Sequence, residues 1–397
     1  MTEDLTKLRE SLAESVRGTA GPLVVAALRA VPRHLFLPGV AASEVYRDEA
    51  IATKRDAHGV AVSSSSQPRL MAIMLDRLDL KPGHRVLEIG AGTGYNAALI
   101  RHIVGPTGTV VSIDIDQDLV DGAGAHLAAA GYRDVTVLCR DGAEGAAEQA
   151  PFDRLIATVG LSDLSPAWLD QLAPGARMLV PLEVRGPMLC IAFERGDGCW
   201  ASGAVDPCGF IKVRGTLAGP SVDVALTGQT VLRLPERREV DPAGLLRALS
   251  DGAVTTVPTG VAAGSSTLVW GLYPWLCGSE PLAGALTERL AAGEPGRLGR
   301  TPTRSEQFRG TYGLVAGGSA AMFTVTDDDE LTVTGYGGDG ASLAQSLLTA
   351  VRAWEAAGRP STRGLHVDAY PAGAEVPPHA EFVIDRPSTR FAVYHVA

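Results

Sequence analysis

Short apolar runs alternate with segments of helical periodicity between residues 85 and 181. Runs such as RVLEI at 85–89 and TVVSI at 109–113 are bounded by Gly or Asp, which is typical of buried strands. Strands that alternate with helices predict a doubly wound, largely parallel α/β sheet. The predicted strands are 85–89, 109–113, 135–138, 152–159 and 176–181, and the predicted helices are 95–104, 118–130 and 166–172.

The segments before this region predict helices, and the segments after it predict strands that no longer alternate regularly with helices. Residues 3–30 and 68–78 are predicted helices, and the polar stretch 48–66 is a predicted loop. The later expectations are strands at 188–194, 210–214, 230–234, 266–272, 311–315, 321–325, 330–336, 381–385 and 390–395, with helices at 281–292 and 341–357. We therefore expect a Rossmann-like domain over 1–218 and an extra C-terminal α+β domain over 219–397.

Composition narrows the classes of function. The 397-residue chain carries a net charge of −10, so it lacks the basic field that nucleic-acid binding requires. Its first residues are charged and lack an apolar signal core, and no apolar run approaches the ~20 residues that span a bilayer. The five cysteines form no CxxC pair. We expect a cytoplasmic protein without a membrane segment, nucleic-acid partner or metal site.

The sequence VLEIGAGTGY at 86–95 is the strongest chemical signal. A buried strand ends in Gly90, Gly92 and Gly94, and glycines let a backbone turn tightly against a ligand. The GxGxG spacing differs from the GxGxxG of most dinucleotide folds. Glu88 would repel a pyrophosphate, whereas S-adenosylmethionine (SAM) has no phosphate and carries two positive charges. The loop therefore favours SAM.

Two later strand ends extend this cofactor prediction. Asp114 ends the second strand, where a carboxylate would meet a ribose diol. Asp141 and Gly142 follow the third strand, at a polar tip suited to an adenine amino group. Each acid alone is also compatible with a loop carboxylate or a helix cap, and the three strand ends together favour SAM.

These residues, with their surroundings, resemble the protein-L-isoaspartate O-methyltransferase family over about residues 20–218. The matching segments are VPRHLFLP at 31–38, SSSSQP at 63–68, APFD at 150–153, LAPGARMLVP at 172–181 and FIKV at 210–213. The resemblance implies a SAM-dependent carboxyl O-methyltransferase that releases S-adenosylhomocysteine.

Roles follow from the resemblance position by position. Ser66 matches the family's active-site serine and would orient the acceptor carboxylate. The implied substrate-binding residues are Ser64, Ser65, His58 and Arg69. The implied cofactor-binding residues are Ser63, Glu88, Gly90, Ala91, Gly92, Thr93, Gly94, Asn96, Asp114, Ile115, Asp141, Gly142, Val159 and Thr216.

The chain also departs from the family pattern. Arg69, Leu70 and Met71 stand where the family often has a histidine, and ordinary repair enzymes lack the long C-terminal extension. With the segment 53–68, these features resemble the FxLD-system methyltransferases associated with lanthipeptides. That resemblance implies esterification of an Asp side chain in a modified precursor peptide, followed by aspartimide or isoaspartate formation.

Three alternatives remain at this point. The chain could be a general isoaspartate repair methyltransferase, a reading opposed by its extra domain. It could be a dinucleotide-dependent oxidoreductase, which the GxGxG spacing and Glu88 disfavour. It could also be a peptide-binding module on a non-catalytic scaffold, against which the intact cofactor residues argue. The sequence does not fix the oligomeric state.

Overall fold

A computed structural model describes residues 4–57, 60–262, 264, 267–290, 298, 300–305, 308–328, 330–362 and 364–395. The chain divides into two compact units. The first unit comprises Met1–Leu182, Met188–Ala218 and His366–Val393, and the second comprises Glu183–Pro187, Gly219–Leu365 and Tyr394–Ala397. Within the described residues, no helix has the length and apolar character to cross a membrane.

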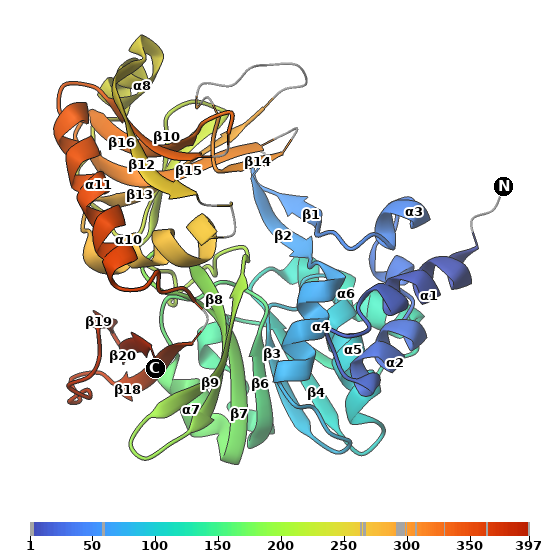
Figure 1. The fold of residues 1–397 in the computed structure, drawn as a ribbon. Helices are drawn as coiled ribbons and strands as arrows, with labels where there is room; N and C mark the ends of the chain where they lie inside the picture. Colours follow the sequence, from blue (N-terminus) through green and yellow to red (C-terminus); the bar gives the residue numbers. More distant parts are fainter. Residues whose placement is uncertain are drawn as a thin grey trace. The chain divides into compact units, whose positions relative to one another are not determined.

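The first unit is built on one sheet whose strand order is β19-β20-β18-β9-β8-β7-β6-β3-β4-β5 (Figure 1). Its parallel part pairs β3 with β4 and β6, β4 with β5, and β6 with β7. The strands of this part are β3 (Arg85–Ile89), β4 (Thr109–Asp114), β5 (Thr136–Cys139), β6 (Phe152–Ala157) and β7 (Leu172–Glu183). The predicted doubly wound, Rossmann-like sheet is therefore confirmed.

Helices connect or precede these strands in the predicted order. They are α1 (Leu5–Ser15), α2 (Pro22–Ala30), α3 (Ala42–Val45), α4 (Pro68–Arg77), α5 (Tyr95–Val104), α6 (Gln117–Ala129) and α7 (Pro166–Gln171). The apolar faces of α2, α4 and α5 share one buried core with Val86 of β3 and Val110 of β4. Burial of these faces fixes the carboxyl ends of the strands, where the glycine loop begins.

The predicted strand 188–194 lies at the other end of this sheet, beside strands that the sequence analysis did not place in the first domain. Antiparallel β8 (Met188–Arg195) and β9 (Trp200–Cys208) are followed by β18 (Leu365–Pro371), which pairs with β9 through Ala369 and Trp200. Strands β19 (Phe382–Asp385) and β20 (Thr389–His395) complete the edge. Residues 366–393 thus belong to the first unit, and the expected contiguous domain over 219–397 is wrong in this segment.

The second unit is an antiparallel sheet in the order β10-β11-β13-β15-β16-β17-β12, with β14 beside β15. Its strands are β10 (Val222–Ala225), β11 (Thr230–Leu234), β12 (Ala253–Ala262), β13 (Ala283–Arg289), β14 (Thr303–Ser305), β15 (Phe308–Ala316), β16 (Ser319–Val325) and β17 (Glu330–Tyr336). Helix α11 (Gly340–Ala356) packs on one face of this sheet. Helix α8 (Pro242–Asp251) packs on the other.

Two predicted elements of this unit are wrong in type. Residues 281–292 were expected to form a helix, but Ala283–Arg289 is strand β13 between β11 and β15. Residues 266–272 were expected to form a strand, but Leu268–Leu272 is helical and continues into α10 (Tyr273–Ser279). In the first unit, the predicted strand 210–214 is reduced to an isolated bridge at Lys212, and the predicted loop 48–66 contains a hairpin.

Candidate functional site

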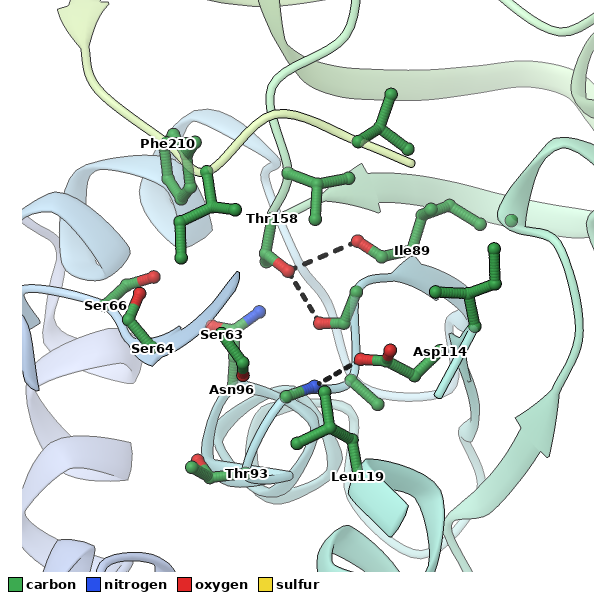
Figure 2. A pocket seen from close by; sticks show the side chains of 18 of the residues that line it. Ser63, Ser64, Ser66, Ile89, Thr93, Asn96, Asp114, Leu119, Thr158 and Phe210 are labelled. Carbon is green, nitrogen blue, oxygen red and sulfur yellow. Dashed lines mark hydrogen bonds between the residues drawn. The ribbon is translucent and has the colours of Figure 1, made fainter. Parts of the chain in front are cut away.

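The glycine loop after β3 forms one wall of a cavity in the first unit (Figure 2). Gly90 has φ +100°, and a Cβ atom there would lie 2.6 Å from Oγ1 of Thr158. The N–H groups of Gly90 and Ala91 donate to the carbonyl of Ile113, at 2.8 and 3.0 Å. The loop therefore needs glycine at position 90 and is held against the end of β4.

Two carboxylates lie at this loop in different surroundings, one at the cavity and one buried. Asp114 lines the cavity, and its Oδ2 accepts from the N–H of Gly92 at 2.9 Å. Glu88 is fully buried behind the loop, where it accepts hydrogen bonds from Ser112 and, at 2.8 Å, from Nδ2 of Asn96. Burial raises the pKa of Glu88 to about 7, against the opposing effect of these hydrogen bonds. Glu88 thus supports Asn96 rather than lining the cavity itself.

Asn96 provides a test of whether the cavity suits SAM. Its side chain lines the cavity, and its Oδ1 atom is buried without a hydrogen-bond partner among the described residues. A buried amide oxygen requires a donor, and the ammonium group of SAM can supply one. Three features therefore fit SAM. They are the Oδ1 atom of Asn96 without a partner, the space at Gly90 that a Cβ atom would fill, and the carboxylate of Asp114 in the cavity lining.

The third strand end carries Asp141 beside Gly142. Asp141 accepts from Ala143 N–H at 2.9 Å and from both N–H and Oγ1 of Thr216, at 3.0 and 2.6 Å. Partial burial acts to raise the pKa of Asp141, but these hydrogen bonds outweigh it and lower the pKa. Gly142 lines the cavity, whereas Asp141 and Thr216 form a pair beside it.

The serine run forms the facing wall. Strand β2 (Ala61–Ser65) pairs with β1 (Ile51–Arg55), and burial alternates along it. Ser63 accepts from Oγ1 of Thr53 at 3.1 Å, and Ser65 is largely buried but also lines the cavity. Ser64 and Ser66 line the cavity (Figure 2), and their hydroxyls make no hydrogen bond to the described residues. These two hydroxyls are free to orient a ligand.

Of the predicted basic substrate-binding residues, Arg69 is described by the structure and does not line the cavity. Arg69 donates from its backbone N–H and from Nε to Asp48, at 2.8 and 3.0 Å, and from its guanidinium to the carbonyl of Ser15. It is not a lining residue, so its interactions are structural. His58 lies outside the described residues.

Sequence reasoning missed several lining residues. They are Val62, Met71, Ile89, Tyr95, Ile113, Leu119, Thr158, Phe210, Ile211, Lys212, Val213 and Arg214. Thr158 follows β6 in the same way that Asp114 ends β4, and this strand-end position was a usable signal. Residues 210–214 lack such a signal because they reach the cavity without forming a regular strand.

One ion-pair network joins the two walls. Asp116 accepts from Nζ of Lys54 at 2.8 Å and from the guanidinium of Arg214 at 3.1 and 2.7 Å. The hydrogen bonds from Arg214, followed by those from Lys54, lower the pKa of Asp116 to about 2. The network ties β1 and the 210–214 segment to the end of β4.

Comparison with known proteins shows what this chain resembles. Residues 8–217 match the family described as protein-L-isoaspartate(D-aspartate) O-methyltransferase (PCMT). A protein-L-isoaspartate O-methyltransferase of Methanothrix thermoacetophila is 38% identical over 189 residues, which cover 48% of this chain and 87% of the relative. Protein-L-isoaspartate O-methyltransferase 1 of Archaeoglobus fulgidus is 36% identical over 206 residues, 51% of this chain and 92% of the relative.

A solved structure extends the likeness in fold beyond the matched sequence. A chain titled protein-L-isoaspartate O-methyltransferase aligns with a TM-score of 0.52 and 23% identity. The alignment covers 91% of this chain and 96% of that one. The likeness in fold therefore extends over the second unit as well as the first.

Proposed function

We propose, from the premise that this chain belongs to the protein-L-isoaspartate(D-aspartate) O-methyltransferase family, that it esterifies the free carboxylate of an L-isoaspartyl residue in a peptide or protein. The chain is a SAM-dependent carboxyl methyltransferase. The observation that carries the choice of acceptor is the pair of available hydroxyls, Ser64 and Ser66, on the same cavity as the glycine loop.

The chemistry requires positioning more than acid–base catalysis. When bound, SAM supplies a methyl group on an electrophilic sulfonium. An acceptor carboxylate has an ordinary pKa of about 4 and is already ionised at neutral pH, so no general base is needed. Ser66, assisted by Ser64, would donate to one carboxylate oxygen and leave the other free to form the new C–O bond.

The proposed cofactor contacts lie on the opposite wall. Asp114 would accept from the ribose hydroxyls, Oδ1 of Asn96 from the ammonium group, and the Gly142 backbone would meet the adenine. Glu88 and Gly94 would act through the loop, and Asp141 with Thr216 would support the adenine end. Ser63, Ala91, Thr93, Ile115 and Val159 complete the proposed contacts.

A direct assay tests the acceptor. Two peptides of identical sequence, one with L-isoaspartate and one with L-aspartate, are incubated with the enzyme and SAM. We expect the isoaspartyl peptide alone to gain a methyl group, which alkali then releases as methanol. Methylation of neither peptide, with SAM binding intact, would overturn the proposed acceptor.

A second candidate acceptor is the Asp side chain of a modified, ribosomally made precursor peptide. Met71, within the segment that departs from the family pattern, lines the cavity and gives this wall an apolar side chain. In this reaction the following backbone nitrogen attacks the methyl ester, methanol leaves, and an imide forms that water can reopen to isoaspartate. Methylation of a cyclised Asp peptide, with none of the isoaspartyl peptide, would select this candidate.

We propose that the second unit contributes to peptide recognition in either case. Its sheet is buried on both faces, so it is a folded body that could present a surface to a long chain. The acceptor KM should then fall when the peptide is lengthened around the same isoaspartyl residue. Equal KM values for short and long peptides would contradict this role.

A further inference from the structure

Arg33 lies directly beneath the wall of the cavity that Ser63–Ser66 form, here called the serine wall. It belongs to a short 3-10 helix (Arg33–Phe36), and its side chain is fully buried. Its guanidinium donates to the carbonyl of Ser66 at 3.1 Å and more weakly to Oγ of Ser65 at 3.4 Å. Further bonds reach the carbonyls of Val45, Arg47 and Glu49, at 2.7, 3.1 and 3.2 Å. One side chain therefore fixes both the residues before β1 and the end of the serine wall.

All of these acceptors are neutral oxygens. Arg33 forms no ion pair with a carboxylate in the described part of the chain, and its buried Nε has no hydrogen-bond partner there. Asp48 attracts Arg33 electrostatically, but its oxygens are hydrogen-bonded to Arg69 and Gln67. A buried cation without a counter-ion is costly, and burial accordingly lowers the pKa of Arg33.

We propose that Arg33 is a positioning residue whose positive charge, which no ion pair neutralises, makes the Ser64–Ser66 wall selective for a carboxylate acceptor. The inference rests on the proposed function, because it assigns the acceptor carboxylate to this wall. The guanidinium holds the Ser66 carbonyl from behind, and its charge attracts an anion bound on the cavity side of the same residue. A neutral acceptor would leave that charge without an adjacent anion.

Kinetics of an Arg33→Gln variant test the charge. We expect the KM for the isoaspartyl peptide to rise about tenfold or more, while the SAM dissociation constant changes less than about threefold. Arg33→Lys keeps the charge with fewer donors and should recover most of the loss. Arg154→Gln is the control, because Arg154 is also buried and donates to the carbonyls of Leu78, Asp153 and Asp79, away from the cavity, although its guanidinium also lies 3.6 Å from the Asp79 carboxylate. An unchanged acceptor KM in folded Arg33→Gln would overturn the proposal.

A second measurement needs neither acceptor nor methyl transfer. Ser66→Cys places a thiol on the wall, and its pKa is measured from the pH dependence of alkylation, resolved by mass spectrometry, with exposed Cys139 as internal reference. We expect the thiol pKa to rise by about one unit when Arg33→Gln is added. Equal values would overturn the charge assignment, whereas failure to methylate isoaspartate would overturn only the proposed function.

The thiol measurement also works if Arg33→Gln does not fold. Ser66→Cys and Ser64→Cys then compare two positions of the wall with Arg33 intact, in the presence of the same lining charges Asp114, Lys212 and Arg214. The guanidinium contacts residue 66 and not residue 64, so the lower thiol pKa should belong to Ser66→Cys. The opposite order, or equal values, would contradict the proposal.

Discussion

The two walls of the cavity are built in different ways. The cofactor wall consists of the carboxyl ends of parallel strands and the loop between β3 and α5, so backbone hydrogen bonds of the main sheet hold it. The serine wall is a separate two-stranded hairpin, held by side chains such as Arg33 and Lys54. The difference shows that the binding site of the methyl donor can be predicted from one short motif. The binding site of the acceptor depends on contacts between segments that are distant in the sequence.

The largest effect is expected on the cofactor wall. Asp114→Ala removes the proposed acceptor for two ribose hydroxyls and the bond to Gly92 N–H, and hydrogen bonds to a charged group contribute about 1.5–3 kcal/mol. SAM affinity should fall about 100-fold, measured by calorimetry. Asp121→Ala, an exposed acid on α6, is the control. Equal SAM affinity in both variants would remove Asp114 from the site.

The second effect concerns the stability of the same wall. Because burial raises the folded pKa of Glu88 to about 7, folded protein keeps a proton that unfolded chain releases above about 4.5. The free energy of unfolding should fall by about 2 kcal/mol as pH rises from 4.5 to 7, and Glu88→Gln should lack this fall. Urea denaturation without SAM measures it. A difference between variant and native protein that is independent of pH would show that Glu88 has an ordinary pKa.

A smaller effect is expected on the serine wall. Ser66→Ala should lower kcat/KM for the acceptor about tenfold, because one hydrogen bond to a charged oxygen is lost. SAM affinity should stay unchanged, since the cofactor wall does not depend on this hydroxyl. Ser64→Ala should have a similar effect, and the double variant shows whether the two act together. A loss of SAM binding in Ser66→Ala would mean that the two walls are not separable.

The smallest effect should come from the network that joins the walls. Asp116→Asn should destabilise the protein by about 1 kcal/mol at neutral pH, because it breaks the ion pairs with Lys54 and Arg214. Since the folded pKa of Asp116 is lowered to about 2, this stabilisation is present above pH 4 and is lost as pH falls toward 2. Chemical denaturation between pH 7 and pH 3 checks the trend, and a penalty that grows toward acid would contradict it.

Much of the cofactor wall could be predicted from the sequence because its residues lie in short motifs at the ends of consecutive strands. The apolar run at 85–89, the glycines after it and the acid at 114 lie on consecutive strands, and all occupy the predicted edge. The acceptor side could not be predicted as well. Arg33 and Arg214 reach it from positions far apart in the chain, and Arg69, which is near Ser66 in sequence, contacts Asp48 instead.

The errors in the second unit have a similar cause. The sequence 281–292 is rich in alanine and leucine, which favours a helix, but its residues 283–289 form β13 between two other strands. Ala285 packs in the core on one face of the sheet and Leu286 in the core on the other. Burial on both faces removes the polar alternation that would have indicated a strand, so tertiary packing overrides the local preference.

The return of residues 366–393 to the first unit makes the second unit an insertion rather than an appended tail. Ser202 of β9 is bonded to Asp368 and Val367, at 3.0 and 2.9 Å, and the buried Trp200 pairs with Ala369. A chain ended at residue 218 would keep every cavity-lining residue but leave β9 as an uncovered edge, which is a template for strand-to-strand aggregation. A minimal catalytic fragment should therefore replace the inserted unit with a short linker and retain residues 366–393.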